Sequence, residues 1–247
     1  MIPPIDVVVL TWNDGPLLAR AVESVVASEG VEAHIIVVDN GSDPPAEVAH
    51  EATLIRNADN RGVAPARNQG VRAGSAPIVC LLDSDAALLP HSLATLAASV
   101  LASDDIGLAA PVFVGQTPEA SAGRAPSTAR KVARVLGWRD EYATVTRAPD
   151  AVQWDVDFSI GACQVFRRDA FDKVGGLDDT YFYGPEDVDF CLRLREAGWR
   201  IVQRSDALVE HPPRRRNRRL FSRRGINHAW AVTRHLWRHR GFGRRVR

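Results

Sequence analysis

Residues 5–15, Ile-Asp-Val-Val-Val-Leu-Thr-Trp-Asn-Asp-Gly, join a short β-branched run to a polar turn. Residues 16–28 follow with apolar side chains at helical spacing. This order predicts a buried strand, a loop and an amphipathic helix. Such a unit is typical of the start of a parallel α/β sheet.

The same alternation continues along the chain. Further strands are predicted at 35–38, 53–55, 78–82 and 106–112, and further helices at 63–73 and 91–101. The predicted fold class is therefore α/β, with a Rossmann-like, mostly parallel sheet flanked by helices. Residues 115–150 lose this periodicity and are predicted to form an insertion that faces a substrate.

The composition is that of an ordinary globular protein, because 45% of the 247 residues are hydrophobic and 25% are charged. Three cysteines cannot all pair with one another, which favours a reducing compartment. No basic segment precedes the first apolar run, and no apolar run approaches the ~18 residues of a membrane-spanning helix. We therefore expect a cytoplasmic protein.

The charge is distributed unevenly. Residues 212–247 hold 13 arginines and no acidic residue, whereas residues 1–211 hold 18 basic and 30 acidic residues. Within residues 214–240, Trp230 and Trp237 share one helical face among the arginines, which is typical of a helix on an anionic membrane surface. A tail packed on the domain and a disordered tail stay open as alternatives. Nucleic acid is not an expected partner, because no recognised binding module accompanies the charge.

Polar residues follow the predicted strands at the points where they end. Asn13, Asp39 and the pair Asp83 and Asp85 come directly after apolar runs. The carboxyl ends of parallel strands meet at one edge of the sheet, where such folds bind ligands. Any one of these residues alone could serve only as a turn residue. No GxGxxG or P-loop motif is present.

The Asp83-Ser84-Asp85 segment is the most specific of these features. Its two carboxylates can face one point only if the strand has already ended at Asp83. They would then offer oxygen ligands to a divalent cation that also binds phosphate. An Asx turn before the next helix is the alternative reading. Upstream, Arg67 and Asn68 lie on the first turns of a predicted helix, suited to contacting a diphosphate or orienting the metal loop.

Several segments together resemble the family 2 glycosyltransferases, and most closely their bacterial rhamnosyltransferase-like branch. They are VVVLTWND (7–14), IIVVDNGS (35–42), NRGVAPARNQG (60–70), LLDSDA (81–86), and residues 159–201 with His211. The resemblance runs from Ile5 to His211 and implies a GT-A fold. It implies a glycosyltransferase domain at 1–211, with a nucleotide-sugar half at 1–112 and an acceptor half at 113–211, before a basic extension at 212–247.

The resemblance also implies roles for individual residues. Thr11 and Asp39 would hold the nucleotide base, within a nucleotide-sugar site that includes Asn13, Asn40, Arg67, Asn68, Asp83 and Ser84. Asp85, Asp83 and His211 would hold a divalent metal ion, Mn²⁺ or Mg²⁺, and the imidazole favours Mn²⁺. A purely structural role for His211 stays open.

Glu186 and Asp187 are the candidate catalytic residues, with Asp187 as general base for an acceptor hydroxyl. A helix cap is the competing reading, because an acidic residue is favoured at a helix start on its own account. Asp189 is predicted to pair with Arg193 one turn later. Nearby aromatic residues are predicted either to stack on a sugar or to pack in the core; they are Trp154, Tyr181, Phe182 and Tyr183.

The predicted function is that of an inverting glycosyltransferase. Its donor would be a dTDP- or UDP-linked sugar, with rhamnose as a candidate, and its acceptor a glycan or a polyprenyl-linked glycan at the inner face of the cell membrane. A nucleotidyltransferase of related fold is one alternative, although the first turn lacks its Gly-rich, Lys-containing loop. A non-catalytic membrane- or glycan-binding relative is the other, and the DSD and ED pairs argue against it.

Overall fold

The computed structural model describes residues 1–115, 120–124 and 150–212. The predicted insertion lies mostly outside these residues. The basic extension lies outside them except for Pro212, so the predicted helix at 214–240 is not described. Within the described part of the chain, no helix is both long and apolar enough to cross a lipid bilayer.

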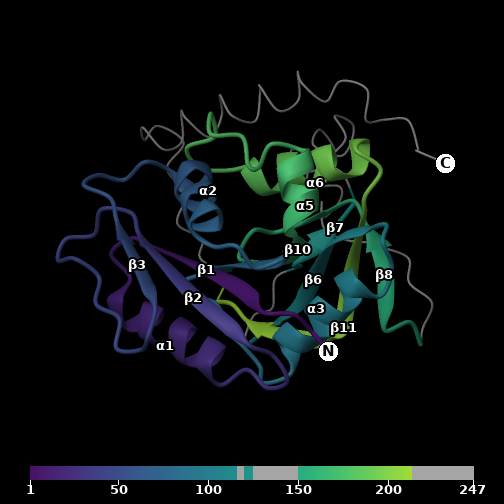
Figure 1. The fold of residues 1–247 in the computed structure, drawn as a ribbon, viewed down its shortest axis with the longest axis horizontal. Coiled ribbons are helices and arrows are strands. Elements are labelled where there is room, and N and C mark those ends of the chain that lie inside the picture. Colours follow the sequence, from purple (N-terminus) through teal and green to yellow (C-terminus); the bar gives the residue numbers. More distant parts are fainter. Residues whose placement is uncertain (116–119, 125–149, 213–247) are drawn as a thin grey trace, which may run out of the picture.

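A nine-stranded sheet forms the centre of the molecule (Figure 1). Its first four strands are parallel and lie in the order β3-β2-β1-β4. They are β1 (Ile5–Thr11), β2 (Ala33–Asp39), β3 (Thr53–Arg56) and β4 (Ile78–Asp83). The carboxyl ends of these four strands lie at one edge of the sheet, as the alternation of strands and helices predicts.

Later strands extend the sheet beyond β4 in the order β10-β6-β11-β5. Strand β10 (Cys163–Arg167) is antiparallel to both of its neighbours, β4 and β6 (Ile106–Val114). Strand β11 (Arg200–Glu210) is parallel to β6, and both β5 (Ala87–Leu88) and β8 (Gln153–Val156) pair antiparallel with β11. A separate two-stranded sheet joins β7 (Ala122–Gly123) to β9 (Phe158–Ser159). The sheet is thus mixed on this side.

Helices cover both faces of the large sheet (Figure 1). One face packs against α1 (Gly15–Val26) and α3 (Ser92–Leu101), and its core includes Leu18, Val22 and Leu96. The other face packs against α2 (Val63–Ala73), α5 (Arg168–Lys173) and α6 (Glu186–Glu196). The predicted helices at 16–28, 63–73 and 91–101 correspond to α1, α2 and α3, each within two residues at either end.

Strand β1 supplies apolar side chains to both faces of the large sheet. Val7 and Val9 belong to the core beneath α1, whereas Val8 belongs to the core beneath α2. A strand covered by helices on both sides needs apolar residues at consecutive positions, which explains the continuous β-branched run.

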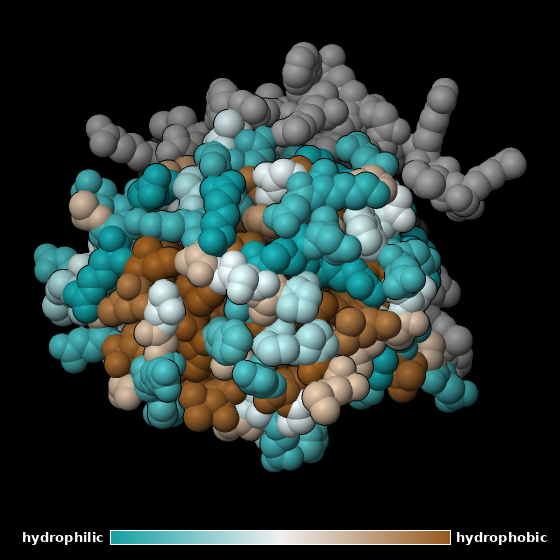
Figure 2. Space-filling view, in the orientation of Figure 1, coloured by the Kyte–Doolittle hydropathy of each residue, from teal (hydrophilic) through white to brown (hydrophobic). Residues whose placement is uncertain are grey.

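Teal, hydrophilic surface covers the helices around α2 and α6 in Figure 2, while brown, apolar surface is exposed lower on the same face.

Candidate active site

Three potential metal ligands converge at the carboxyl edge of the sheet. Asp83, Asp85 and His211 each offer a ligand atom, and these atoms all lie within 4.8 Å of one another. The chain turns directly after β4, where the Ala86 N–H donates to the Asp83 carbonyl over 3.0 Å. The strand therefore ends at Asp83. This is the condition under which the Asp83 and Asp85 carboxylates can face one point.

The long strand β11 brings His211 to this point. Glu210 at its end pairs with Ala87 of β5, two residues after Asp85. His211 Nε2 consequently lies 3.7 Å from Asp85 Oδ1, and the ring packs against Phe113 with centroids 4.9 Å apart. His211 Nδ1 is buried without a hydrogen-bond partner among the described residues, so this nitrogen makes no structural hydrogen bond there. Two carboxylates and an uncommitted imidazole fit a borderline divalent cation such as Mn²⁺.

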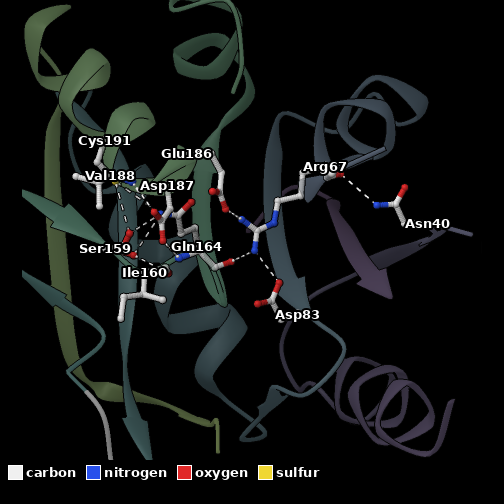
Figure 3. A network of polar contacts seen from close by, with 12 residues as sticks. Asn40, Arg67, Asp83, Ser159, Ile160, Gln164, Glu186, Asp187, Val188 and Cys191 are labelled. Carbon is white, nitrogen blue, oxygen red and sulfur yellow. Dashed lines mark hydrogen bonds and ion pairs between the residues drawn. The ribbon is translucent and has the colours of Figure 1, made fainter. Parts of the chain in front are cut away.

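A buried arginine lies beside the metal-ligand cluster (Figure 3). Arg67, on α2, donates from Nη2 to Asp83 Oδ1 over 2.6 Å and to the Gly161 carbonyl over 2.8 Å. Its Nη1 donates to Glu186 Oε1 over 3.1 Å. Burial opposes the charged guanidinium, but the charges of Asp83 and Glu186 outweigh it and raise the pKa of Arg67. These contacts join Arg67 to Asp83 of the metal-ligand cluster. The two roles predicted for Arg67, contact with a diphosphate and orientation of the metal loop, stay predictions.

The acidic pair lies at the start of α6. Glu186 is buried, and its Oε2 has no hydrogen-bond partner in the described part of the chain. Burial, followed by the charge of Asp187, raises the pKa of Glu186 to about 7. Asp187 is half-buried and accepts the Gly161 N–H over 2.9 Å and the Val188 N–H over 2.8 Å. Burial also raises the pKa of Asp187, against these hydrogen bonds.

The raised pKa of Glu186 predicts a pH dependence of stability. A carboxyl group whose pKa is higher when folded stabilises the protein below its unfolded pKa of 4.5, and this contribution is lost as the pH rises through about 7. Each unit of such a shift corresponds to about 1.4 kcal/mol. We expect the melting temperature to fall between pH 5 and pH 8, and Glu186→Gln to reduce that fall. Calorimetry of both proteins across this range measures it; equal slopes would contradict the burial of an ionisable Glu186.

Thr11 and Asp39 lie at the carboxyl ends of β1 and β2, and Asp39 holds the loop that follows β2. Asp39 pairs with Thr11 across β1 and β2, and its carboxylate accepts the Ser42 and Ala46 N–H groups, each over 2.9 Å. Burial opposes the ionised form of Asp39, but hydrogen bonding by the Ser42 side chain and by these two N–H groups lowers the pKa of Asp39. Thr11 Oγ1 is buried without a hydrogen-bond partner in the described residues. The predicted contacts of Thr11 and Asp39 with a nucleotide base stay predictions.

Two asparagines predicted for the nucleotide-sugar site hold neighbouring loops instead of facing open space. The Asn40 side chain bonds to Asn57, Asn60, Arg61 and Gly62, all within 57–62. The Asn68 side chain bonds to both backbone groups of Leu177 and to Asp179. Both asparagines are buried. These hydrogen bonds position loops, and the predicted roles of Asn40 and Asn68 in the nucleotide-sugar site stay predictions.

Two further nucleotide-site candidates link adjacent loops. Asn13 has a positive φ of 59° and accepts the Asp43 N–H over 2.8 Å, while its own N–H donates to Ser42 Oγ. Ser84 donates from its hydroxyl to Asp14 Oδ2 over 3.1 Å. These contacts join the loops after β1, β2 and β4, which surround one edge of the sheet. Their predicted roles in donor binding stay predictions.

Some residues around Glu186 and Asp187 are buried, whereas others are exposed. Asp189 accepts a hydrogen bond from Arg193 Nε over 2.7 Å, which confirms the predicted i,i+4 pair. Tyr181 belongs to the core and Trp154 is partly buried against it, whereas Phe182 and Tyr183 are 39% and 46% exposed just before Glu186. Tyr181 is therefore a core residue, and for the other three aromatic residues substrate stacking stays a prediction.

Sequence reasoning assigned no role to Gly161. Its N–H binds Asp187 and its carbonyl binds Arg67, because the loop before β10 runs beside the end of β4. A lone glycine beside a short apolar run carries little signal in the sequence. Only the antiparallel position of β10 reveals this role.

Comparisons with known proteins agree with this geometry. The profile of the family described as Glycosyl transferase family 2 matches residues 6–175, and one described as N-terminal domain of galactosyltransferase matches residues 151–215. The fold is that of a mannosyltransferase from Pyrobaculum calidifontis solved with GDP-Man and Mn²⁺, with a TM-score of 0.64 and 20% identity over 96% of this chain and 64% of that one. The predicted GT-A fold is confirmed.

Two relatives from Mycobacterium tuberculosis (strain CDC 1551 / Oshkosh) cover most of the chain. A pre-mycofactocin glycosyltransferase is 32% identical over 90% of this chain and 45% of its own length. An N-acetylglucosaminyl-diphospho-decaprenol L-rhamnosyltransferase is 30% identical over 84% of this chain and 75% of its own. The chain thus spans less than half of the first relative and three quarters of the second. With the family profile matching 170 of its 247 residues, the chain belongs to glycosyl transferase family 2.

Proposed function

We propose that the chain transfers a sugar from a nucleotide diphosphate sugar to an acceptor hydroxyl with inversion at the anomeric carbon. The observation that carries this proposal is the position of the Asp83, Asp85 and His211 cluster next to the Glu186-Asp187 pair, with Arg67 bonded to both. A cation site and a base beside each other suit a reaction in which a diphosphate departs as a hydroxyl attacks.

In this proposal, Asp187 accepts the proton of the acceptor hydroxyl. The acceptor oxygen forms a bond to the anomeric carbon, and the bond from that carbon to the diphosphate oxygen breaks, its electron pair leaving with the diphosphate. The Gly161 N–H orients the Asp187 carboxylate through a 2.9 Å hydrogen bond. Asp83, Asp85 and His211 would hold Mn²⁺ or Mg²⁺, which supplies positive charge to the departing diphosphate.

We further propose a donor, an acceptor and a membrane contact for this chain. The donor is a dTDP- or UDP-linked sugar, with rhamnose as a candidate because one relative is named a rhamnosyltransferase. The acceptor is a glycan or a polyprenyl-linked glycan, whose binding the half at 113–211 provides. The basic extension, through residues 214–240, is proposed to contact anionic lipid at the inner face of the cell membrane, on the strength of its arginines and tryptophans.

A screen of nucleotide sugars tests the proposal. The protein is incubated with UDP-, dTDP- and GDP-linked sugars, with Mn²⁺ or with EDTA, and release of the nucleoside diphosphate is measured. We expect release from one donor class and its loss in EDTA. Release of pyrophosphate from a nucleoside triphosphate would instead support a nucleotidyltransferase, and binding of nucleotide sugars without turnover would support a non-catalytic relative.

His211→Ala tests the third ligand of the metal site. Because the imidazole would bind the cation and not the nucleotide, we expect the affinity for Mn²⁺ to fall by at least about 10- to 100-fold, which is the effect of removing even a residue that only supports a metal ligand. Binding of UDP or dTDP without metal should change little. Titration calorimetry with Mn²⁺, with and without nucleotide, separates the two effects. An unchanged Mn²⁺ titration would return His211 to a structural role against Phe113.

A further inference from the structure

Arg67 is the one side chain drawn in Figure 3 that joins the metal-ligand side of the site to the acidic pair. Its guanidinium contacts three separate segments: the end of β4 at Asp83, the loop before β10 at Gly161, and the start of α6 at Glu186. These contacts connect residues 16, 94 and 119 positions away in the chain. The Arg67 side chain is 4% exposed, so water competes little for these hydrogen bonds.

Gly161 extends the connection to the second carboxylate of the acidic pair. Its carbonyl accepts from Arg67 Nη2, while its N–H donates to Asp187 Oδ2. A displacement of the guanidinium would therefore move or release Gly161, and with it a hydrogen bond that holds Asp187. Both acidic side chains thus depend on Arg67, Glu186 directly and Asp187 through one residue.

The guanidinium also packs against Gly161 without space to spare. A Cβ atom added at Gly161 would lie 2.5 Å from Arg67 Nη1, closer than real Cβ contacts come. No positive φ is recorded at Gly161, so alanine is compatible with its backbone. The absence of a side chain at this position therefore serves the close approach of Arg67.

We propose that Arg67 is a positioning residue for sugar transfer: it holds the Glu186-Asp187 pair at a set distance from the metal-binding Asp83 and does not itself act on the substrate. This inference rests on the function proposed above. Both terminal nitrogens of Arg67 are committed to protein acceptors, which leaves the carboxylates to meet metal and acceptor. A planar guanidinium can serve acceptors on three segments at once, whereas a lysine ammonium is a point charge that cannot match this geometry.

Two substitutions at Arg67 separate its geometry from its charge. Arg67→Lys keeps the positive charge but loses the planar guanidinium with its two terminal nitrogens. We expect turnover at saturating donor and Mn²⁺ to fall about 10- to 100-fold, with a small change in the KM for donor. Arg67→Gln also removes the charge. Among the described residues, the other ionisable groups that act on Glu186 include Asp83, Asp187 and Tyr183, none of which is positively charged. The Arg67 charge also lowers the pKa of Asp187, the proposed base. The acidic limb of the pH–rate profile should therefore move to higher pH in Arg67→Gln only.

Gly161→Ala is a second route to the same effect, because it leaves Arg67 in the sequence but forces its guanidinium to shift. We expect turnover to fall in this variant too. The matched control is Arg168→Lys. Arg168 is another arginine with three acceptors, Ala76, Val71 and Asp6, but it begins α5, just after the end of β10 that is distant from Gly161. Arg168→Lys should lower the melting temperature and leave turnover per folded molecule unchanged.

A readout without substrate keeps this inference apart from the proposed function. The ionisation of Glu186 can be followed by NMR in metal-free protein carrying ¹³C-labelled glutamate carboxyls, with Glu186→Gln used to assign the signal. We expect its midpoint to rise in Arg67→Gln and to change less in Arg67→Lys. If no nucleotide sugar is turned over, the proposed function fails, but the NMR result still tests the positioning of Glu186. Wild-type turnover in Arg67→Lys, or an unmoved midpoint in Arg67→Gln, would overturn the inference.

Discussion

Asp85→Ala is expected to abolish sugar transfer and metal-dependent nucleotide binding while the protein stays folded. The Asp85 side chain is 6% exposed, and its carboxylate lies with the Asp83 carboxylate and the His211 imidazole in a cluster whose ligand atoms are within 4.8 Å of one another. Removing one carboxylate leaves a single acidic ligand beside the imidazole. Loss of the cation removes several kcal/mol of charge stabilisation from the departing diphosphate, which corresponds to a decrease of about 10³-fold or more in rate.

The measurement compares nucleoside diphosphate release by wild type and variant across a Mn²⁺ titration. The matched control is Asp105→Ala, at an exposed aspartate that pairs with Arg200, away from the metal-ligand cluster. This control should retain wild-type turnover. Two outcomes would contradict the metal site: undiminished wild-type activity in EDTA, or an Asp85→Ala variant that responds normally to Mn²⁺.

Asp187→Asn is expected to lower turnover by about 10²- to 10⁴-fold, the range that a positioned general base contributes. Asparagine keeps an oxygen that can accept the Gly161 N–H, so the local geometry should survive. It cannot take a proton from the acceptor hydroxyl. Donor affinity should change little, because the loss falls on the transition state.

Asp189→Asn is the control on the same helix. Asp189 is completely buried and forms an ion pair with Arg193. Its substitution therefore disturbs a structural pair two residues from the candidate base. We expect a lower melting temperature and near-normal turnover per folded molecule. If Asp187→Asn instead lost donor binding while turnover per bound donor stayed normal, Asp187 would be a structural residue of the helix start and not the base.

Many local elements of the first half of this protein follow from its sequence. The β-branched run before Thr11 predicts β1, and the apolar spacing after it predicts α1. Asp83-Ser84-Asp85 predicts the turn that ends β4, and Asp189 predicts its partner Arg193 one helical turn away. Each of these features depends on residues close in the chain, where the periods of strands and helices and the preferences of turns act directly.

The assembly of the site depends on the tertiary structure. His211 reaches Asp85 only because β11 pairs with β5, and Gly161 reaches Arg67 only because β10 enters the sheet antiparallel beside β4. The Asn68 amide donates to the Leu177 carbonyl, 109 positions away, and no local pattern indicates this partner. These partners are chosen by strand pairing and by the need to satisfy buried polar groups between distant segments. Local periodicity carries no record of such pairings. The sequence by itself therefore determined β1 to β4, β6, α1 to α3 and the turn after β4, and the packing of distant segments decided where β10 and β11 enter the sheet and which polar residues meet.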